Sequence, residues 1–207
     1  MEENVKRRNR FAFSGAAAWI LAGCGLLAAS GCGGSVPAPK TFTAYQSPSG
    51  RFACDYPQGW QVEGAGKPDS PNSWAKFTQG HAEIRVEADL AGSLFGDMAK
   101  SSGGMLGGDD EPPVAKIHPM GERHMKEEFS NHTEREPKPF QSKGIGEGRR
   151  STFIADQTLG GKVYGYRATL LANDRRVTVV CTCPATNWQV LKPAFEKVIV
   201  SLRQGGS

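Results

Sequence analysis

Beyond its first ten residues the sequence has almost no excess of basic over acidic residues. The chain holds 25 Lys and Arg against 21 Asp and Glu, but four of the basic and two of the acidic residues lie in residues 1–10, which leaves 21 against 19. Proteins that bind nucleic acid neutralise phosphates with clustered Lys and Arg, and no arginine-rich stripe is present here. The balanced charge therefore predicts that the chain binds no nucleic acid.

The sequence also lacks the motifs that mark common catalytic sites. No G-x-S-x-G elbow surrounds Ser151 or another serine, so a hydrolase triad has no recognisable nucleophile. Residues 144–148 are glycine-rich like a phosphate-binding loop, but no Lys-Ser/Thr pair follows them and a strand is predicted next. We therefore predict no catalytic residue and no cofactor, and we expect that the protein is not an enzyme.

Metal-binding spacings are absent as well. The one cluster that combines histidine and carboxylate residues comprises His118, Glu122, His124, Glu127, Glu128 and His132. Metal-binding helices place histidines four residues apart, whereas the spacings of six and eight found here do not bring the rings to one face. The cluster is typical of a solvated, charged helix surface. Asp109-Asp110-Glu111 lacks the alternating ligands of a calcium loop and is expected to be an exposed turn. No metal site is predicted.

Three cysteines lie beyond residue 40, and their odd number allows at most one disulfide bond among them. Cys54, Cys181 and Cys183 all fall on apolar faces of predicted strands. In an oxidising compartment, a bridge between Cys54 and one of the other two is the leading interpretation. Two alternatives stay open. The thiols could be buried as small apolar residues, or Cys181 and Cys183 could form a soft-metal or redox site, although the two-residue spacer typical of such sites is missing.

The first 32 residues have the pattern of an export signal followed by a lipid attachment site. Four basic residues precede the uncharged run Phe11–Ala29. Within it, Leu21-Ala22-Gly23-Cys24 matches the lipobox of bacterial lipoproteins, and Ala29-Ser30-Gly31-Cys32 is a looser copy. We expect lipidation of Cys24, with Cys32 as the alternative. The competing interpretation is an uncleaved membrane-spanning anchor, because about 19 apolar residues lie at the lower limit for a span.

This interpretation divides the chain into three parts. Residues 1–23 are the expected signal peptide (1–31 if Cys32 carries the lipid), and residues 24–40 are a tether rich in Gly, Pro and Ser. Residues 41–207 have a length that suits one domain with a single core. We expect the mature protein on a bacterial cell membrane, with this domain facing the periplasm or the exterior.

Alternating apolar and polar residues predict strands along most of this domain, most clearly at His81–Leu90. Further strands are expected at residues 41–46, 51–56, 60–62, 73–79, 149–156, 162–171 and 175–183. Helices are expected at residues 91–105, from about Pro119, and at 188–202, where apolar residues recur at steps of three and four and Pro193 predicts a kink or a restart. The order of these elements favours the α+β class: an antiparallel sheet with packed helices and a closing C-terminal amphipathic helix.

Two segments at the ends of the domain have the character of family motifs. Residues 51–60 (RFACDYPQGW) and residues 188–202 resemble the opening motif and the closing helix of the PsbP-like superfamily, which is named for the extrinsic oxygen-evolving protein of photosystem II and includes bacterial lipoproteins. The resemblance covers residues 41–203 in outline. It implies a PsbP-like fold and a non-catalytic binding or assembly module, because members of the superfamily serve as partners of other proteins. It transfers no metal-binding or partner-binding residue to this chain.

Taken together, these features predict a membrane-tethered, non-enzymatic lipoprotein that binds a protein partner in the cell envelope. The expected contact surface is the polar face of the sheet or the segment rich in His and Glu. The alternative is a periplasmic protein that binds a metal or a small ligand through its Cys and His residues.

Overall fold

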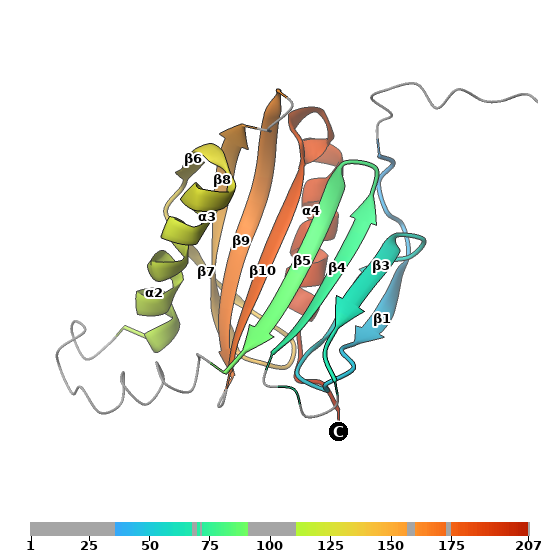
Figure 1. The fold of residues 1–207 in the computed structure, drawn as a ribbon, viewed down its shortest axis with the longest axis vertical. Helices are drawn as coiled ribbons and strands as arrows, with labels where there is room; N and C mark the ends of the chain where they lie inside the picture. Colours follow the sequence, from blue (N-terminus) through green and yellow to red (C-terminus); the bar gives the residue numbers. More distant parts are fainter. Residues whose placement is uncertain are drawn as a thin grey trace, which may run out of the picture. The chain divides into compact units, whose positions relative to one another are not determined.

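Eight antiparallel strands form one sheet in the computed structural model, in the order β3-β4-β5-β10-β9-β8-β6, with β7 also paired to the outer edge of β8 (Figure 1). Their bounds are β3 Gln61–Ala65, β4 Ser73–Gln79, β5 Ala82–Asp89, β6 Ser130–Glu134, β7 Lys138–Gln141, β8 Glu147–Asp156, β9 Lys162–Ala172 and β10 Arg175–Pro184. The structure describes residues 36–67, 70, 72–90, 111–156, 160–172 and 175–206. The expected signal peptide, most of the tether, Cys24, Cys32 and the helix expected at 91–105 lie outside these residues.

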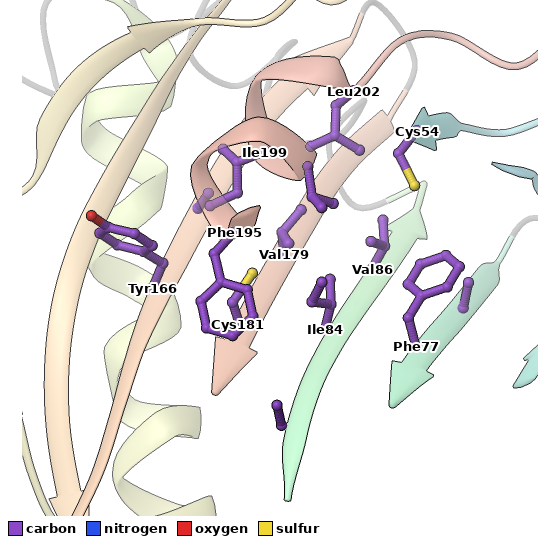
Figure 2. Close-up of a cluster of buried hydrophobic side chains, with 14 of the residues drawn as sticks. Cys54, Phe77, Ile84, Val86, Tyr166, Val179, Cys181, Phe195, Ile199 and Leu202 are labelled. Carbon is purple, nitrogen blue, oxygen red and sulfur yellow. The ribbon is translucent and has the colours of Figure 1, made fainter. Parts of the chain in front are cut away.

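One face of the sheet carries the larger core. The long C-terminal helix α4 (Trp188–Ser201) packs there, preceded by the 3-10 turn η2 (Ala185–Asn187) and accompanied by a separate two-stranded ribbon, β1 (Phe42–Gln46) and β2 (Ala53–Pro57). Helix α4 lies behind the sheet in Figure 1, and Figure 2 shows some of the side chains that it shares with the sheet. The largest fully buried side chains of this core are Phe52, Phe77, Ile84, Leu170, Leu191, Phe195, Ile199 and Leu202.

The opposite face carries a shorter helical segment. Helix α2 (Pro113–Ile117), the 3-10 turn η1 (His118–Gly121) and helix α3 (Glu122–Glu128) follow one another without a break. They lie over β8, β9 and β6, where a second apolar cluster comprises Met125, Phe153, Ala155, Val163 and Val180, with Phe129 packed against it. The faces of β3, β4 and β5 on this side are therefore left without a covering helix in the described chain (Figure 1).

The strands form where the sequence alternates, because successive side chains in a strand point to opposite faces. In β5 the residues at every second position, from Ala82 to Ala88, are buried, whereas Glu83, Arg85, Glu87 and Asp89 point to the open face. In the centre of the sheet, Gly165 of β9 has a steric role. A Cβ at this position would collide with the carbonyl oxygen of Cys181 and the ring of Phe153.

The expected fold class requires correction in its balance of helix and sheet. The sequence predicted an α+β structure, an antiparallel sheet with packed helices and a closing C-terminal helix; the sheet and the closing helix are present, but the described chain is mainly antiparallel β-sheet, with α4 as its one long helix. Two segments explain the difference. Residues 130–134 and 138–141, for which no strand was expected, form β6 and β7 at the edge of the sheet.

The helical segment begins earlier than expected. Helix α2 starts at Pro113, and Pro119 lies in the first turn of η1, which leads directly into α3 with Met125 buried. Helix α4 continues through Pro193 without a restart, and Leu191, Phe195 and Val198, on both sides of the proline, are buried in the core. No helix among the described residues is long and apolar enough to span a membrane.

Candidate functional site

A buried polar cluster lies between the helical segment and the sheet. Its members are Glu134 of β6, Arg167 and Thr169 of β9, Ser151 of β8 and His118 at the start of η1. Alternation along β9 places Arg167 and Thr169 on the same face as Val163, beneath the helices. The cluster thus joins three strands to the turn between α2 and α3.

An ion pair between Arg167 and Glu134 forms the centre of the cluster. The two side chains are only 3% and 5% exposed, Arg167 Nη2 lies 2.8 Å from Glu134 Oε1, and Nε donates to both carboxylate oxygens at 3.0 and 3.2 Å. The remaining nitrogen, Nη1, donates to the backbone carbonyl of His118 at 2.6 Å. A Cβ on Gly121 would lie 2.7 Å from Nη1, so a residue without a side chain is needed for this approach. A buried pair of charges is stable only when its donors and acceptors are filled in this way.

Both ring nitrogens of His118 are hydrogen-bonded. Nδ1 lies 2.9 Å from the hydroxyl of Thr169, and Nε2 lies 2.7 Å from the hydroxyl of Ser151 and 3.5 Å from Glu134 Oε1. Ser151 and His118 are each 1% exposed. The site therefore contains a serine and a histidine within the contact distance of a nucleophile and its base.

The direction of the hydrogen bonds argues against such a catalytic pair. A carboxylate can only accept, so Glu134 beside Nε2 favours the tautomer with the proton on Nε2, which donates to Ser151. With the proton on Nε2, Nδ1 accepts from the hydroxyl of Thr169, and the hydroxyl hydrogen of Ser151 is left to donate elsewhere than to the ring. In a Ser-His-Asp triad the carboxylate is on Nδ1 and the serine donates to Nε2. The arrangement here is the reverse, and it serves to fix the ring and to join the helical segment to the sheet.

The electrostatics of the cluster follow from burial and pairing. Burial lowers the pKa of His118, and the nearby Arg167 charge adds to this effect, so the ring is neutral at pH 7. Burial alone would raise the pKa of Glu134, but hydrogen bonds from His118 and Arg167 outweigh it and lower this pKa to about 2. The folded cluster thus contains an ionised glutamate, an arginine and a neutral histidine.

A second histidine, His132 of β6, is buried beside the cluster. Neither of its ring nitrogens has a hydrogen-bond partner among the described residues, and Nε2 lies 3.8 Å from Glu134 Oε2. Its ring packs 5.1 Å from the ring of Phe153, and burial lowers its pKa. The preceding residue, Asn131, has a φ of 51° at a register shift in β6, and this irregularity sets the direction of His132.

A small polar cleft opens onto the cluster. It has a volume of about 220 Å³, with His118, Ser151, Glu134 and Arg167 among its lining residues and Glu122, Arg135 and Glu136 among the others. Since the first four are already bonded to one another, the cleft offers few free donors at its base.

The expected solvated cluster of histidines and glutamates is wrong for two of its histidines. His118 and His132 are buried, and only His124 is exposed on α3. The carboxylates are largely paired: Glu122 with Lys126, Glu127 with Arg123, and Glu128 with Arg85 of β5 through two hydrogen bonds of 2.8 and 2.6 Å. Of the expected acidic turn, residues 109 and 110 lie outside the described residues, and Glu111 is exposed.

The three described cysteines are free thiols in the structure, which departs from the predicted disulfide bond. All are buried on the α4 side, and Figure 2 shows Cys181 at the ring of Phe195 and Cys54 well apart from it. Burial raises the pKa of Cys54 and of Cys183 to about 12, and it raises the pKa of Cys181 well above its usual value. Thiols in this state act as small apolar side chains, because the thiolate is the form that binds metals and attacks disulfides.

The cysteines and the buried histidines lie on opposite faces of the sheet. Within the described residues, no group of three or more His, Cys, Asp or Glu side chains is arranged to hold a metal ion. The alternative function that relied on these residues therefore gains no support from their positions.

Sequence reasoning missed Glu134, Arg167 and Thr169, and it considered Ser151 only as a nucleophile. One signal was available: Arg167 lies in the middle of a predicted strand, between Tyr166 and Ala168. A charge at such a position requires a buried partner. The partner, 33 residues away in a segment not expected to be a strand, could not be found from the pattern.

The open face of the sheet is the second notable surface. It carries Trp74 and Lys76 of β4, which the register places beside Glu87 and Arg85 of β5. Trp74 is 39% exposed, and Lys76 pairs with Glu63 of β3 at 3.0 Å. A cleft of about 180 Å³ separates this face from the helical segment and is lined by apolar and basic residues, including Met120, Met125, Val180, Arg85, Arg176 and Thr178.

Solved structures show similarity to the fold. The solution structure of the cyanobacterial PsbP protein CyanoP from Synechocystis matches with a TM-score of 0.53 at 12% identity, over 85% of this chain and 98% of that chain. The chain thus has a PsbP-like fold, in agreement with the family resemblance of its sequence.

Two further structures match with a TM-score of 0.46. One is a Pseudomonas aeruginosa protein of unknown function, with 10% identity over 80% of this chain and 99% of that chain. The other is from Bacteroides thetaiotaomicron, with 15% identity over 79% of this chain and 48% of that chain. No protein-family model and no curated protein matches the sequence.

We expect acid to destabilise the fold through the buried cluster. His118 and Glu134 bind protons less readily when folded than when unfolded, because their pKa values are lowered from 6.5 and 4.5. The free energy of unfolding should fall as the pH drops below 6.5, and again below 4.5. In His118→Gln the decrease in the free energy of unfolding below pH 6.5 should be smaller than in the wild type, by up to about 1.4 kcal/mol per pH unit. Urea denaturation at a series of pH values measures this free energy.

His124→Gln is the matched control, since His124 lies on the same helical segment but is exposed. This variant should keep the pH dependence of the wild type. A His118→Gln protein whose stability depends on pH as steeply as the wild type would contradict the assignment.

Proposed function

We propose that this protein is a lipid-anchored, non-enzymatic binding module that docks onto a protein partner in the cell envelope. The anchor rests on the export signal and the two cysteine-terminated boxes, with Cys24 as the lipidated residue and Cys32 as the alternative. The non-catalytic role is supported by the geometry of the buried cluster, in which Glu134 lies beside Nε2, the nitrogen that contacts Ser151, and not beside Nδ1 as in a hydrolase triad.

The open sheet face carries the docking proposal. Interfaces are enriched in Trp, Met and Arg, and tryptophan is prominent among the residues that contribute most to binding energy. Here Trp74 lies on a face with few other large apolar groups, among paired charges such as Lys76 and Glu63, and Met120 of the adjacent cleft is 59% exposed. An exposed aromatic residue surrounded by polar residues is typical of a protein–protein interface, in which a central apolar anchor is surrounded by a hydrated polar rim.

Membrane attachment should depend on the N-terminal cysteines. We expect that Cys24→Ala together with Cys32→Ala removes lipid labelling by palmitate and releases the protein from the membrane fraction, because one or more acyl chains provide the attachment. Each single variant identifies which cysteine carries the lipid. Cys54→Ala is the control and should leave labelling intact. If the double variant stayed in the membrane fraction, an uncleaved protein anchor would replace the lipid.

Docking should depend on the open face. A photo-crosslinking amino acid at position 74, introduced into living cells, is expected to yield one discrete adduct, which mass spectrometry then identifies. Val190 is the matched control: it is 41% exposed, but it lies on α4, on the other side of the sheet. The adduct at position 74 should weaken when Lys76→Glu is added, since this reverses a charge beside the anchor. Equal adducts from positions 74 and 190 would contradict docking through this face.

A further inference from the structure

A cationic cleft lies on the α4 side of the sheet, away from the open face, and shares Arg135 and Glu136 with the polar cleft that opens onto the buried cluster. It has a volume of about 230 Å³ and is bounded by β7, β8, β9 and α4. Its charged lining residues are Arg135, Lys138, Arg150 and Lys192 against Glu136 and Glu196, so the cleft carries two more positive than negative charges.

Arg150 is held in place in this cleft with most of its hydrogen-bonding capacity unused. Its guanidinium carbon lies 4.5 Å from the centre of the Tyr166 ring, and its side chain is 22% exposed. Tyr166 is fixed in turn, because its hydroxyl donates to Glu196 at 2.6 Å. Figure 2 shows this hydroxyl directed away from Phe195 and the core.

The contact between Arg150 and Glu196 is too long to satisfy the guanidinium. Nη2 lies 3.6 Å from Glu196 Oε1, and no acceptor among the described residues takes a hydrogen bond from Arg150. A planar guanidinium that is stacked on an aromatic ring and retains free N–H groups has the geometry that binds two oxygens of an anion. Stacking reduces the conformational entropy lost on binding, since the guanidinium is already oriented.

The other cations add charge without neutralisation. Arg135, Lys138 and Lys192 have no carboxylate within ion-pair distance among the described residues, unlike Lys76 or Arg167 elsewhere in the protein. An excess of two positive charges is best matched by a group with close to two negative charges. A phosphate monoester carries about −1.5 to −2 at pH 7 and presents three acceptor oxygens, whereas a carboxylate carries only one charge.

We propose that this cleft binds a phosphate group, with the Arg150 guanidinium donating to two of its oxygens and Lys192, Lys138 and Arg135 surrounding it. Pockets for drug-sized ligands measure about 300–1,000 Å³, so this smaller cleft suits the phosphate end of a ligand and not a large organic molecule. The phosphate belongs to a small soluble compound or to a lipid headgroup. This binding is independent of the docking face proposed above.

Calorimetric titration of the purified full chain with inorganic phosphate, at constant ionic strength set with chloride, tests the proposal. We expect saturable binding, and Arg150→Gln should weaken it about tenfold or more, because charged hydrogen bonds contribute about 1.5–3 kcal/mol. Arg149→Gln is the matched control: it removes the same charge from the next residue of β8, but its side chain lies near His118 and pairs with Glu147. Its affinity should stay close to that of the wild type.

Lys192→Gln and Lys138→Gln extend the test to side chains that are not part of the packed core, so these variants should fold. Each should weaken phosphate binding, whereas Lys197→Gln, on the same helix but over the ring of Phe42, should not. Absence of saturable binding by the wild type would overturn the proposal. Equal losses in Arg149→Gln and Arg150→Gln would also overturn it.

Two soluble probes distinguish the sources of the phosphate. Dihexanoyl phosphatidic acid, used below its micelle concentration, should bind more tightly than glycerol 3-phosphate if the ligand is a lipid headgroup. The two should bind equally if the ligand is a small soluble phosphate. In both cases Arg150→Gln should weaken binding, and binding of either probe that was unaffected by this substitution would contradict the proposed site.

Discussion

The buried ion pair between Arg167 and Glu134 is the interaction on which the second face of this protein depends. The two charges come from β6 and β9. Arg167 Nη1 also donates to the carbonyl of His118, the first residue of η1, which connects α2 to α3. Removal of one partner of such a pair leaves a buried charge alone and costs about 3–5 kcal/mol. The pair therefore does more than add stability, because it fixes the place where the helical segment lies on the sheet.

That position determines which part of the sheet remains accessible. The helical segment covers β8 and β9, and the bidentate contact between Arg85 and Glu128 fixes its far end beside β5. The faces of β3 and β4 on this side, with Trp74, stay open in the described chain. On the other side, α4 and the apolar core bury the cysteines, and the cationic cleft lies at the edge. The proposed docking and phosphate sites are thus consequences of what each helix covers.

The sequence predicted the elements whose pattern has a single physical cause. In residues 81–90 apolar and polar residues alternate because one face of the strand meets the core. In α4 apolar residues recur at steps of three and four because one stripe of the helix meets the core. Both β5 and α4 were therefore predicted. The strands β6 and β7 were missed because Ser130–Glu134 is almost wholly polar and Lys138–Gln141 contains a proline. Their place in the sheet comes from pairing with β8, which depends on contacts between strands and not on the pattern within either segment.

The candidate site was harder to predict for a related reason. The spacing of His118, His124 and His132 assumes one regular helix, but a 3-10 turn and an irregular strand intervene and direct two of the rings inward. Likewise, an apolar face shared by three cysteines did not imply that any two thiols meet.

The most direct test of the account is hydrogen–deuterium exchange in the Glu134→Gln variant. If the ion pair holds the helical segment on the sheet, amides in residues 113–134 should exchange faster than in the wild type, while those of β4, β5 and α4 keep their protection. Unchanged exchange in residues 113–134, or equal acceleration throughout the domain, would contradict the account.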